Sequence, residues 1–119
     1  MSLFNLRRLT TMASANKSIV HFKAIGKVQG VCFRAETKDQ ATAMGLTGWC
    51  HNHPDSSVEG VAYGPTEKIK EFRKYLAEGP SAASVERVEY IREVDGPEKQ
   101  VVDELIDGNN KGEFEVRRH

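Results

Sequence analysis

The segment from Gly26 to Arg34, which reads GKVQGVCFR, constrains the fold of this chain more than any other stretch. It lies where a run of alternating apolar residues ends and a helical pattern begins. Gly26 and Gly30 stand four apart, so the backbone can turn tightly and approach a ligand without side chains in the way. The segment therefore predicts a strand, a glycine-rich turn and a helix, in that order.

The same segment predicts a binding site for an anion. A helix that begins near Phe33 adds unsatisfied N–H donors and the positive end of its dipole to the turn. Arg34, on its first turn, supplies a planar and permanently charged guanidinium that suits phosphate oxygens. The GxxxxGK[ST] pattern of a Walker loop is absent. Taken alone, these residues are also compatible with a tight connection that carries a surface arginine.

Periodicity predicts the elements around this segment. Residues 18–28 alternate and carry apolar side chains on both faces, as an interior strand does. A helix follows over about 33–44, because small and apolar residues recur at i, i+4 and i+7, and Gly45 is suited to end it. Residues 46–53 and 58–63 predict two strands of an antiparallel hairpin.

The second half of the chain predicts one more helix and two more strands. Pro65 suits the first position of a second helix, which Gly79 stops. Residues 85–94 predict a fourth strand, and residues 113–117 a short last strand. Between them, residues 95–112 are compatible either with a short helix or with a partly ordered excursion.

This order of elements, β-α-β-β-α-β with a short extra C-terminal strand, predicts an α+β fold. Right-handed crossovers would build it as a ferredoxin-like split βαβ sandwich. We therefore expect an antiparallel sheet with two helices on one face.

Composition narrows the partners of the chain. Its 119 residues suffice for a single domain with a modest core. The 17 basic and 17 acidic residues cancel, so no net charge favours nucleic acid or an anionic membrane. Two cysteines do not make a disulfide framework, and no apolar run approaches the length of a membrane span. We expect a cytoplasmic monomer that neither binds nucleic acid nor inserts into a membrane.

Residues 1–17 differ from the rest of the chain. They contain Arg7, Arg8 and Lys17, several hydroxyl residues, and no Asp or Glu. That composition is compatible with a mitochondrial presequence, with a disordered tail, or with translation that starts at Met12. We expect the folded domain over residues 18–118, with a mitochondrial location as the alternative to the cytoplasm.

Asn52 is the second candidate for a catalytic role. Period two places Leu46, Gly48, Cys50 and Asn52 on one face of their strand. The predicted topology brings the end of this strand near the start of the first helix. A neutral amide there can hold a water in line with a phosphorus atom, while Arg34 and the loop N–H groups hold the phosphoryl oxygens. A site with neither a metal nor a strong base suits a labile phosphate, such as an acyl phosphate.

The pattern resembles the acylphosphatase family, in particular its small common or muscle-type members. The resemblance covers about residues 18–94 and 113–118. It rests on the run from Gly26 to Arg34, followed by Ala41, Gly45-Leu46, Gly48-Trp49, Asn52, Val58-Glu59, Gly64-Pro65, Gly79-Pro80 and Phe114-Glu115-Val116-Arg117-Arg118. It implies hydrolysis of a small-molecule acyl phosphate to a carboxylate and orthophosphate, without a cofactor or a metal.

Position by position, the resemblance makes Arg34 the phosphate-binding residue and Asn52 the residue that orients the attacking water. It also implies that the substrate itself can accept the proton of that water. Ser56 departs from the family, which often has glycine at this place in the hairpin turn. A cradle of backbone N–H groups, here called the phosphate cradle, is implied at Gln29, Gly30, Val31, Cys32, Phe33 and Arg34.

Three other interpretations stay open at this point. The same fold could serve as a non-catalytic module that binds a phosphorylated ligand or RNA, with Phe22 and Trp49 as candidate aromatics. Cys50, His51 and His53 could suggest zinc, although alternation places the cysteine on the face opposite both histidines. Either histidine could also act as a general base near Asn52.

Overall fold

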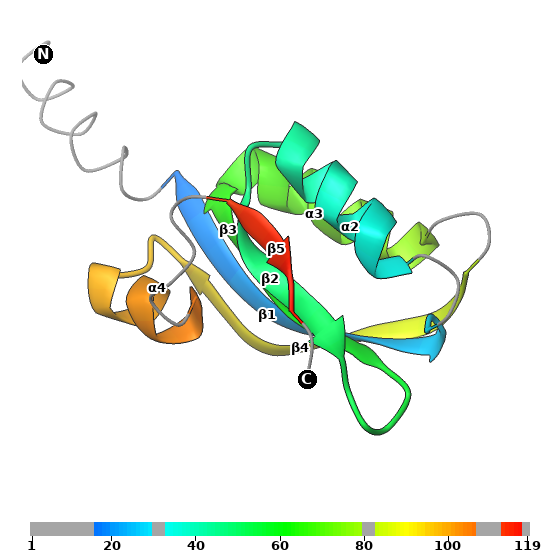
Figure 1. Cartoon of the computed structure of the whole chain (residues 1–119). Coiled ribbons are helices and arrows are strands. Elements are labelled where there is room, and N and C mark those ends of the chain that lie inside the picture. Colours follow the sequence, from blue (N-terminus) through cyan, green and yellow to red (C-terminus); the bar gives the residue numbers. More distant parts are fainter. Residues whose placement is uncertain (1–15, 30–32, 80–82, 107–112, 118–119) are drawn as a thin grey trace, which may run out of the picture.

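The structure is a computed structural model and describes residues 16–29, 33–79, 83–106 and 113–117. Residues 1–15 lie outside the described residues, so the interpretations of the leader and of the domain boundary stay predictions. Figure 1 shows a single sheet with helices on both of its faces. In chain order, the elements are β1 (Lys17–Lys27), α2 (Phe33–Ala43), β2 (Thr47–Asn52), β3 (Val58–Pro65), α3 (Thr66–Glu78), β4 (Ser84–Asp95), α4 (Lys99–Ile106) and β5 (Phe114–Val116).

The sheet has the strand order β4-β1-β3-β2-β5. β1 pairs antiparallel with both β3 and β4, and β2 pairs antiparallel with β3. The ferredoxin-like α+β fold is confirmed, but β5 pairs parallel with β2, so the sheet is mixed and the expectation of a wholly antiparallel sheet is wrong at this edge. Because β4 ends where β5 must begin, at the same end of the sheet, the last connection returns β5 in the direction of β2.

The main core lies between the sheet and the helices α2 and α3. Alternate residues of β1 face these helices, and Val20, Phe22 and Ala24 are all buried there. Phe22 packs edge-on against Phe72 of α3, with ring centroids 5.7 Å apart. A buried aromatic side chain of this kind contributes about 3–5 kcal/mol, judged by truncation to alanine. The predicted buried stripe of α3, with Ile69, Phe72 and Leu76, is confirmed. In α2 the stripe is confirmed at Thr37 and Ala41, but Met44, its expected third member, lies beyond the end of the helix and is only half-buried.

α4 lies on the other face of the sheet (Figure 1). A second cluster of buried apolar side chains lies between this helix and the sheet. Of the two alternatives for residues 95–112, the helix is the one observed over Lys99–Ile106. Its apolar residues contact Ile19 and Val61 of the sheet, and its Leu105 carbonyl accepts a hydrogen bond from Trp49 Nε1 at 2.9 Å. Both faces of the central strands are therefore covered by helices. Within the described part of the chain, no helix is both long enough and apolar enough to cross a bilayer.

One predicted helix boundary is wrong by a residue. Pro65 was expected at the first position of the second helix, but it is the last residue of β3 and pairs with Lys17 of β1. Its ψ of 137° keeps it extended, so α3 begins at Thr66. Gly45 and Gly79 end the two long helices as predicted, with φ of 72° and 71°.

Gly48 is a site of close approach between β2 and β3. Its φ is 151°, and a Cβ at this position would lie 1.8 Å from the carbonyl oxygen of Val61. Neither backbone can give way without separating the two strands. The glycine is thus required by the pairing that also carries Asn52.

We predict that Gly48→Ala lowers the free energy of unfolding by about 3 kcal/mol, since a methyl group would enter the β2–β3 pairing at a positive φ. Gly45→Ala is the matched control, because Gly45 also has a positive φ but has no atom within 4 Å of the position that a methyl group would take. That control should lose only about 1 kcal/mol. Urea unfolding of both variants measures the difference, and equal losses would contradict the explanation by close approach.

Candidate functional site

Arg34 lies on the first turn of α2, directly after the buried Phe33. Its backbone carbonyl faces Cys50 of β2, whose Sγ donates to it across 3.9 Å. Within residues 16–29, 33–79, 83–106 and 113–117, its guanidinium forms no ion pair, neither with Glu36 nor with Asp39. The ordinary role of an arginine on a helix surface, an ion pair with a nearby carboxylate, is therefore not filled by those two residues.

Asn52 is the last residue of β2 and pairs with Val58, the first residue of β3. Its Oδ1 atom is buried and has no hydrogen-bond partner in the described part of the chain. A buried acceptor left unsatisfied costs about 1–3 kcal/mol, so such atoms are rare and call for an explanation. A carboxamide held with a free acceptor is suited to bind a water or a ligand donor.

The sheet brings these two residues to the same end of the molecule. β1 and β2 both run antiparallel to β3, so the loop after β1 and the last residue of β2 lie at the same end of the sheet. Cys50, two residues before Asn52 on the same face, also contacts Arg34. Burial raises the pKa of the Cys50 thiol to about 12, and the nearby positive charge of Arg34 partly opposes that rise. The charge of Arg34 therefore acts on a side chain of β2, the strand that ends in Asn52.

The phosphate cradle is only partly described. Gly30, Val31 and Cys32 lie outside the described residues, so the arrangement of their N–H groups stays a prediction. Gln29 before the gap and Phe33 and Arg34 after it are placed at the same end of the sheet as Asn52.

Gly26 has a different role from the one expected. It was predicted to open the backbone to a ligand, but a Cβ at Gly26 would lie 2.2 Å from the carbonyl oxygen of Ser84. Its φ of 136° accompanies an irregularity in the β1–β4 pairing between Ile25 and Gly26. Gly26 is therefore needed for the approach of β4 to β1.

The side chain of Gln29 is a feature that sequence reasoning missed. Its Nε2 donates to the carbonyl of His53 at 3.0 Å and to the carbonyl of Ser57 at 2.9 Å. These two acceptors flank the pair formed by Asn52 and Val58. No periodicity or spacing in the sequence signals a bond from a side chain to backbone carbonyls so far along the chain.

The histidines of β2 and its turn face the other side of the sheet. His51 stacks on Trp49, with ring centroids 5.1 Å apart and planes inclined by 3°. His53 Nδ1 lies 3.1 Å from Asp55 Oδ1, and both histidines approach Glu59. Cys50 is buried in the main core. Within the described ranges, no three such side chains converge as metal ligands.

The turn between β2 and β3 is held by Asp55. Its carboxylate accepts hydrogen bonds from the backbone N–H of Ser57 at 3.0 Å and from Lys23 at 2.5 Å. Lys23, and then Ser57, hold the pKa of Asp55 well below its usual range. Ser56 stands in this turn with a φ of 75°, a conformation that favours glycine. The departure from the family pattern therefore falls on a residue whose backbone is strained.

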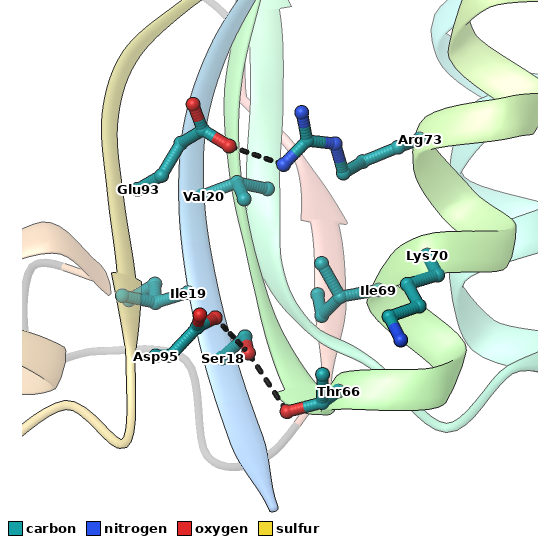
Figure 2. A pocket seen from close by; sticks show the side chains of 9 residues that line it. All are labelled: Ser18, Ile19, Val20, Thr66, Ile69, Lys70, Arg73, Glu93 and Asp95. Atoms are coloured by element: carbon teal, nitrogen blue, oxygen red, sulfur yellow. Dashed lines mark hydrogen bonds and ion pairs between the residues drawn. The ribbon is translucent and has the colours of Figure 1, made fainter. Parts of the chain in front are cut away.

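A cavity of about 200 Å³ lies between α3 and the strands β1 and β4 (Figure 2). It is at the end of the sheet opposite Asn52, because Ser18 in it pairs with Gly64 and Asp95. Several of its polar groups pair with one another: Ser18 Oγ bonds to Asp95 at 2.7 Å and to Thr66 at 2.8 Å, and Arg73 pairs with Glu93. Lys70, which also lines the cavity, pairs with Glu67 outside it. These pairs leave the cavity with little to offer a ligand.

We predict that Ser56→Gly raises the free energy of unfolding by about 0.5–1 kcal/mol, because glycine relieves the left-handed strain of the turn. Ser84→Gly is the control: Ser84 is exposed in β4 and its φ is not positive, so glycine should destabilise the protein there. Urea unfolding of the two variants measures both signs. A loss of stability in Ser56→Gly would show that the hydroxyl matters more than the backbone.

We predict that Cys50 is inert in the folded protein and weakens it at high pH. The folded pKa lies above the unfolded value, so the stability linked to the neutral thiol is complete below about pH 8.5 and is lost as the pH rises toward 12. In a Cys32→Ser background, native protein should not react with a thiol reagent at pH 8, and denatured protein should react once per chain. From pH 9 to 11, the free energy of unfolding should fall more steeply with Cys50 than in Cys50→Ala; parallel curves would contradict this.

The chain is similar in sequence and in fold to known proteins. The family model described as Acylphosphatase matches residues 20–104. A protein of Pelotomaculum thermopropionicum named acylphosphatase is 45% identical over 74 residues, which cover 62% of this chain and 80% of that protein. Acylphosphatase-2 of Mus musculus is 36% identical over 88 residues, which cover 73% and 82%. The structure of an acylphosphatase from Coxiella burnetii matches with a TM-score of 0.67 and 32% identity, over 86% of this chain and 94% of that one.

Proposed function

The chain belongs to the acylphosphatase family of enzymes, and on this premise we propose that Arg34 and Asn52 are its catalytic residues. The substrate is a small acyl phosphate, the mixed anhydride of a carboxylic acid and phosphoric acid. The products are a carboxylate and orthophosphate. The observation that carries the proposal is the buried Oδ1 of Asn52, which has no hydrogen-bond partner among the described residues and lies at the end of the sheet where α2 begins with Phe33 and Arg34.

Arg34 holds the phosphoryl group in this mechanism. Its guanidinium can form two parallel hydrogen bonds to phosphoryl oxygens, and its charge favours the transition state, in which negative charge spreads over those oxygens. The backbone N–H groups of Gln29 to Arg34 bind the same oxygens, and the N-terminus of α2 adds its dipole. This part of the site serves binding and charge stabilisation together.

Asn52 orients the attacking water. Its Oδ1 accepts one hydrogen of that water and aims the oxygen at phosphorus, opposite the leaving carboxylate. The new bond forms between the water oxygen and phosphorus, and the bond from phosphorus to the acyl oxygen breaks. The proton of the water passes to a phosphoryl oxygen of the substrate, since His51 and His53 face the other side of the sheet.

The choice of substrate follows from the leaving group. A carboxylate leaves without a proton, so the reaction needs no general acid, and the site can work with positioning and charge alone. An alkyl phosphate would leave as a strong base and would need such assistance. We accordingly propose an enzyme without a cofactor, acting as a monomer on small molecules, in the cytoplasm or, if residues 1–17 direct it there, in mitochondria.

The alternative of an RNA-binding module has less support. Phe22, one of its two candidate aromatics, is fully buried between the sheet and α3. Trp49 packs against His51 and Arg117 and donates its N–H to Leu105. Neither ring is offered as a platform on which a base could stack.

We predict that Arg34→Ala and Asn52→Ala each lower kcat/KM for benzoyl phosphate about 10²–10³-fold, the usual loss on removing one preorganised transition-state group. The two variants should differ in the kinetic quantity that they change. Arg34→Ala should also weaken inhibition by inorganic phosphate, whereas Asn52→Ala should leave it nearly unchanged and act on kcat. Hydrolysis followed by ultraviolet absorbance measures both.

Arg87→Ala is the control, because Arg87 is an exposed arginine on β4 that bonds only to neighbouring carboxylates in the described structure. It should retain the parent rate. A folded Arg34→Ala variant that hydrolyses benzoyl phosphate as fast as the parent would overturn the assignment.

A further inference from the structure

We propose that the side chain of Gln29 is a positioning residue, which sets the place of Asn52 relative to the phosphate cradle. The inference rests on the proposed function, in which Asn52 orients water. It adds a role for a side chain, whereas the family resemblance implies only the backbone of Gln29.

The topology separates the two parts of the proposed site by one strand. The cradle follows β1 and Asn52 ends β2, but β3 lies between these two strands. Neighbouring strands lie about 4.8 Å apart, so the two halves of the site start from strands about 10 Å apart. The backbone pairing of the sheet alone fixes this spacing only as far as the last pairs, Ala24 with Val58 and Asn52 with Val58.

Gln29 connects the start of the phosphate cradle to the β2–β3 hairpin through both hydrogens of its side-chain amide. Nε2 donates to the carbonyl of Ser57, just before β3, and to the carbonyl of His53, just after β2. These are the first residues beyond the last rung of the β2–β3 pairing. The residue that begins the cradle thus holds the end of the strand that carries Asn52.

Backbone hydrogen bonds also hold the turn whose carbonyls accept from Gln29. The N–H of His53 donates to Ser57 O at 2.8 Å, and the N–H of Ser56 donates to His53 O at 3.1 Å. Asp55 braces the same turn through Ser57 and Lys23. The two carbonyls that accept from Gln29 are therefore themselves held by hydrogen bonds within the hairpin turn. The bonds from Gln29 thus fix the distance between the start of the phosphate cradle and the end of β2.

A displacement of about 1 Å in a positioned group can cost about 10²-fold in rate, so loss of this link should appear in kcat. We predict that Gln29→Met, which keeps the length but removes both donors, lowers kcat for benzoyl phosphate about 10–100-fold. KM and inhibition by inorganic phosphate should change less than about threefold, because Arg34 and the backbone donors remain. Gln100→Met is the matched control, since Gln100 is exposed on α4, and it should retain the parent kcat.

A double-mutant cycle with Asn52→Ala separates positioning from general destabilisation. If Gln29 acts through Asn52, Gln29→Met should lower kcat little further once Asn52 is alanine. Additive losses would overturn the inference, as would a loss confined to phosphate affinity.

A second variant keeps the test decisive. Gln29→Glu has nearly the same shape but sets a carboxylate against two carbonyl oxygens, so it should lower kcat at least as much as Gln29→Met. If neither variant folds in urea titrations, Gln29 is structural and the inference fails. If Asn52→Ala keeps the parent kcat, the proposed role of Asn52 fails first; if only the Gln29 variants keep it, the positioning role alone fails.

Discussion

The antiparallel pairing of β3 with both β1 and β2 is the constraint on which the rest of the structure depends. Val58 is buried and stands in register with Ala24 on one side and Asn52 on the other. Because both neighbours run antiparallel to β3, the loop after β1 and the end of β2 must lie at the same end of the sheet. For this reason, two segments that are far apart in the chain lie at the same end of the sheet.

Keeping that register requires the sheet to be packed on both faces. Phe22 and its neighbours meet α2 and α3, while Ile19 and Val61 meet α4 on the far side. A one-residue slip would turn each set of side chains to the wrong face, so burial on both sides specifies the pairing strongly. The close backbone contact at Gly48 adds a steric requirement to the same pairing.

In the described part of the chain, several polar groups around the site have hydrogen-bond partners, whereas the Oδ1 of Asn52 has none. Gln29 donates to the carbonyls of His53 and Ser57, and Asp55 accepts from the N–H of Ser57. These hydrogen bonds make the end of the hairpin rigid. The Oδ1 of Asn52 is left without a partner in the described chain. A rigid surround around a free acceptor is the arrangement expected of a group held ready to bind, since the cost of leaving it unsatisfied is met by neighbouring packing.

The sequence by itself determined the local elements, because periodicity and glycine chemistry act between near neighbours. The alternation of β1, the stripe of α2 and the helix ends at Gly45 and Gly79 could all be predicted, and family resemblance marked Arg34 and Asn52. The tertiary structure alone decided the parallel pairing of β5, the face covered by α4, the role of Gly26 against β4, and the bonds from Gln29 to the hairpin. Each of these depends on contacts between segments distant in the chain, and no local pattern of side chains encodes which distant backbone atom will lie within reach.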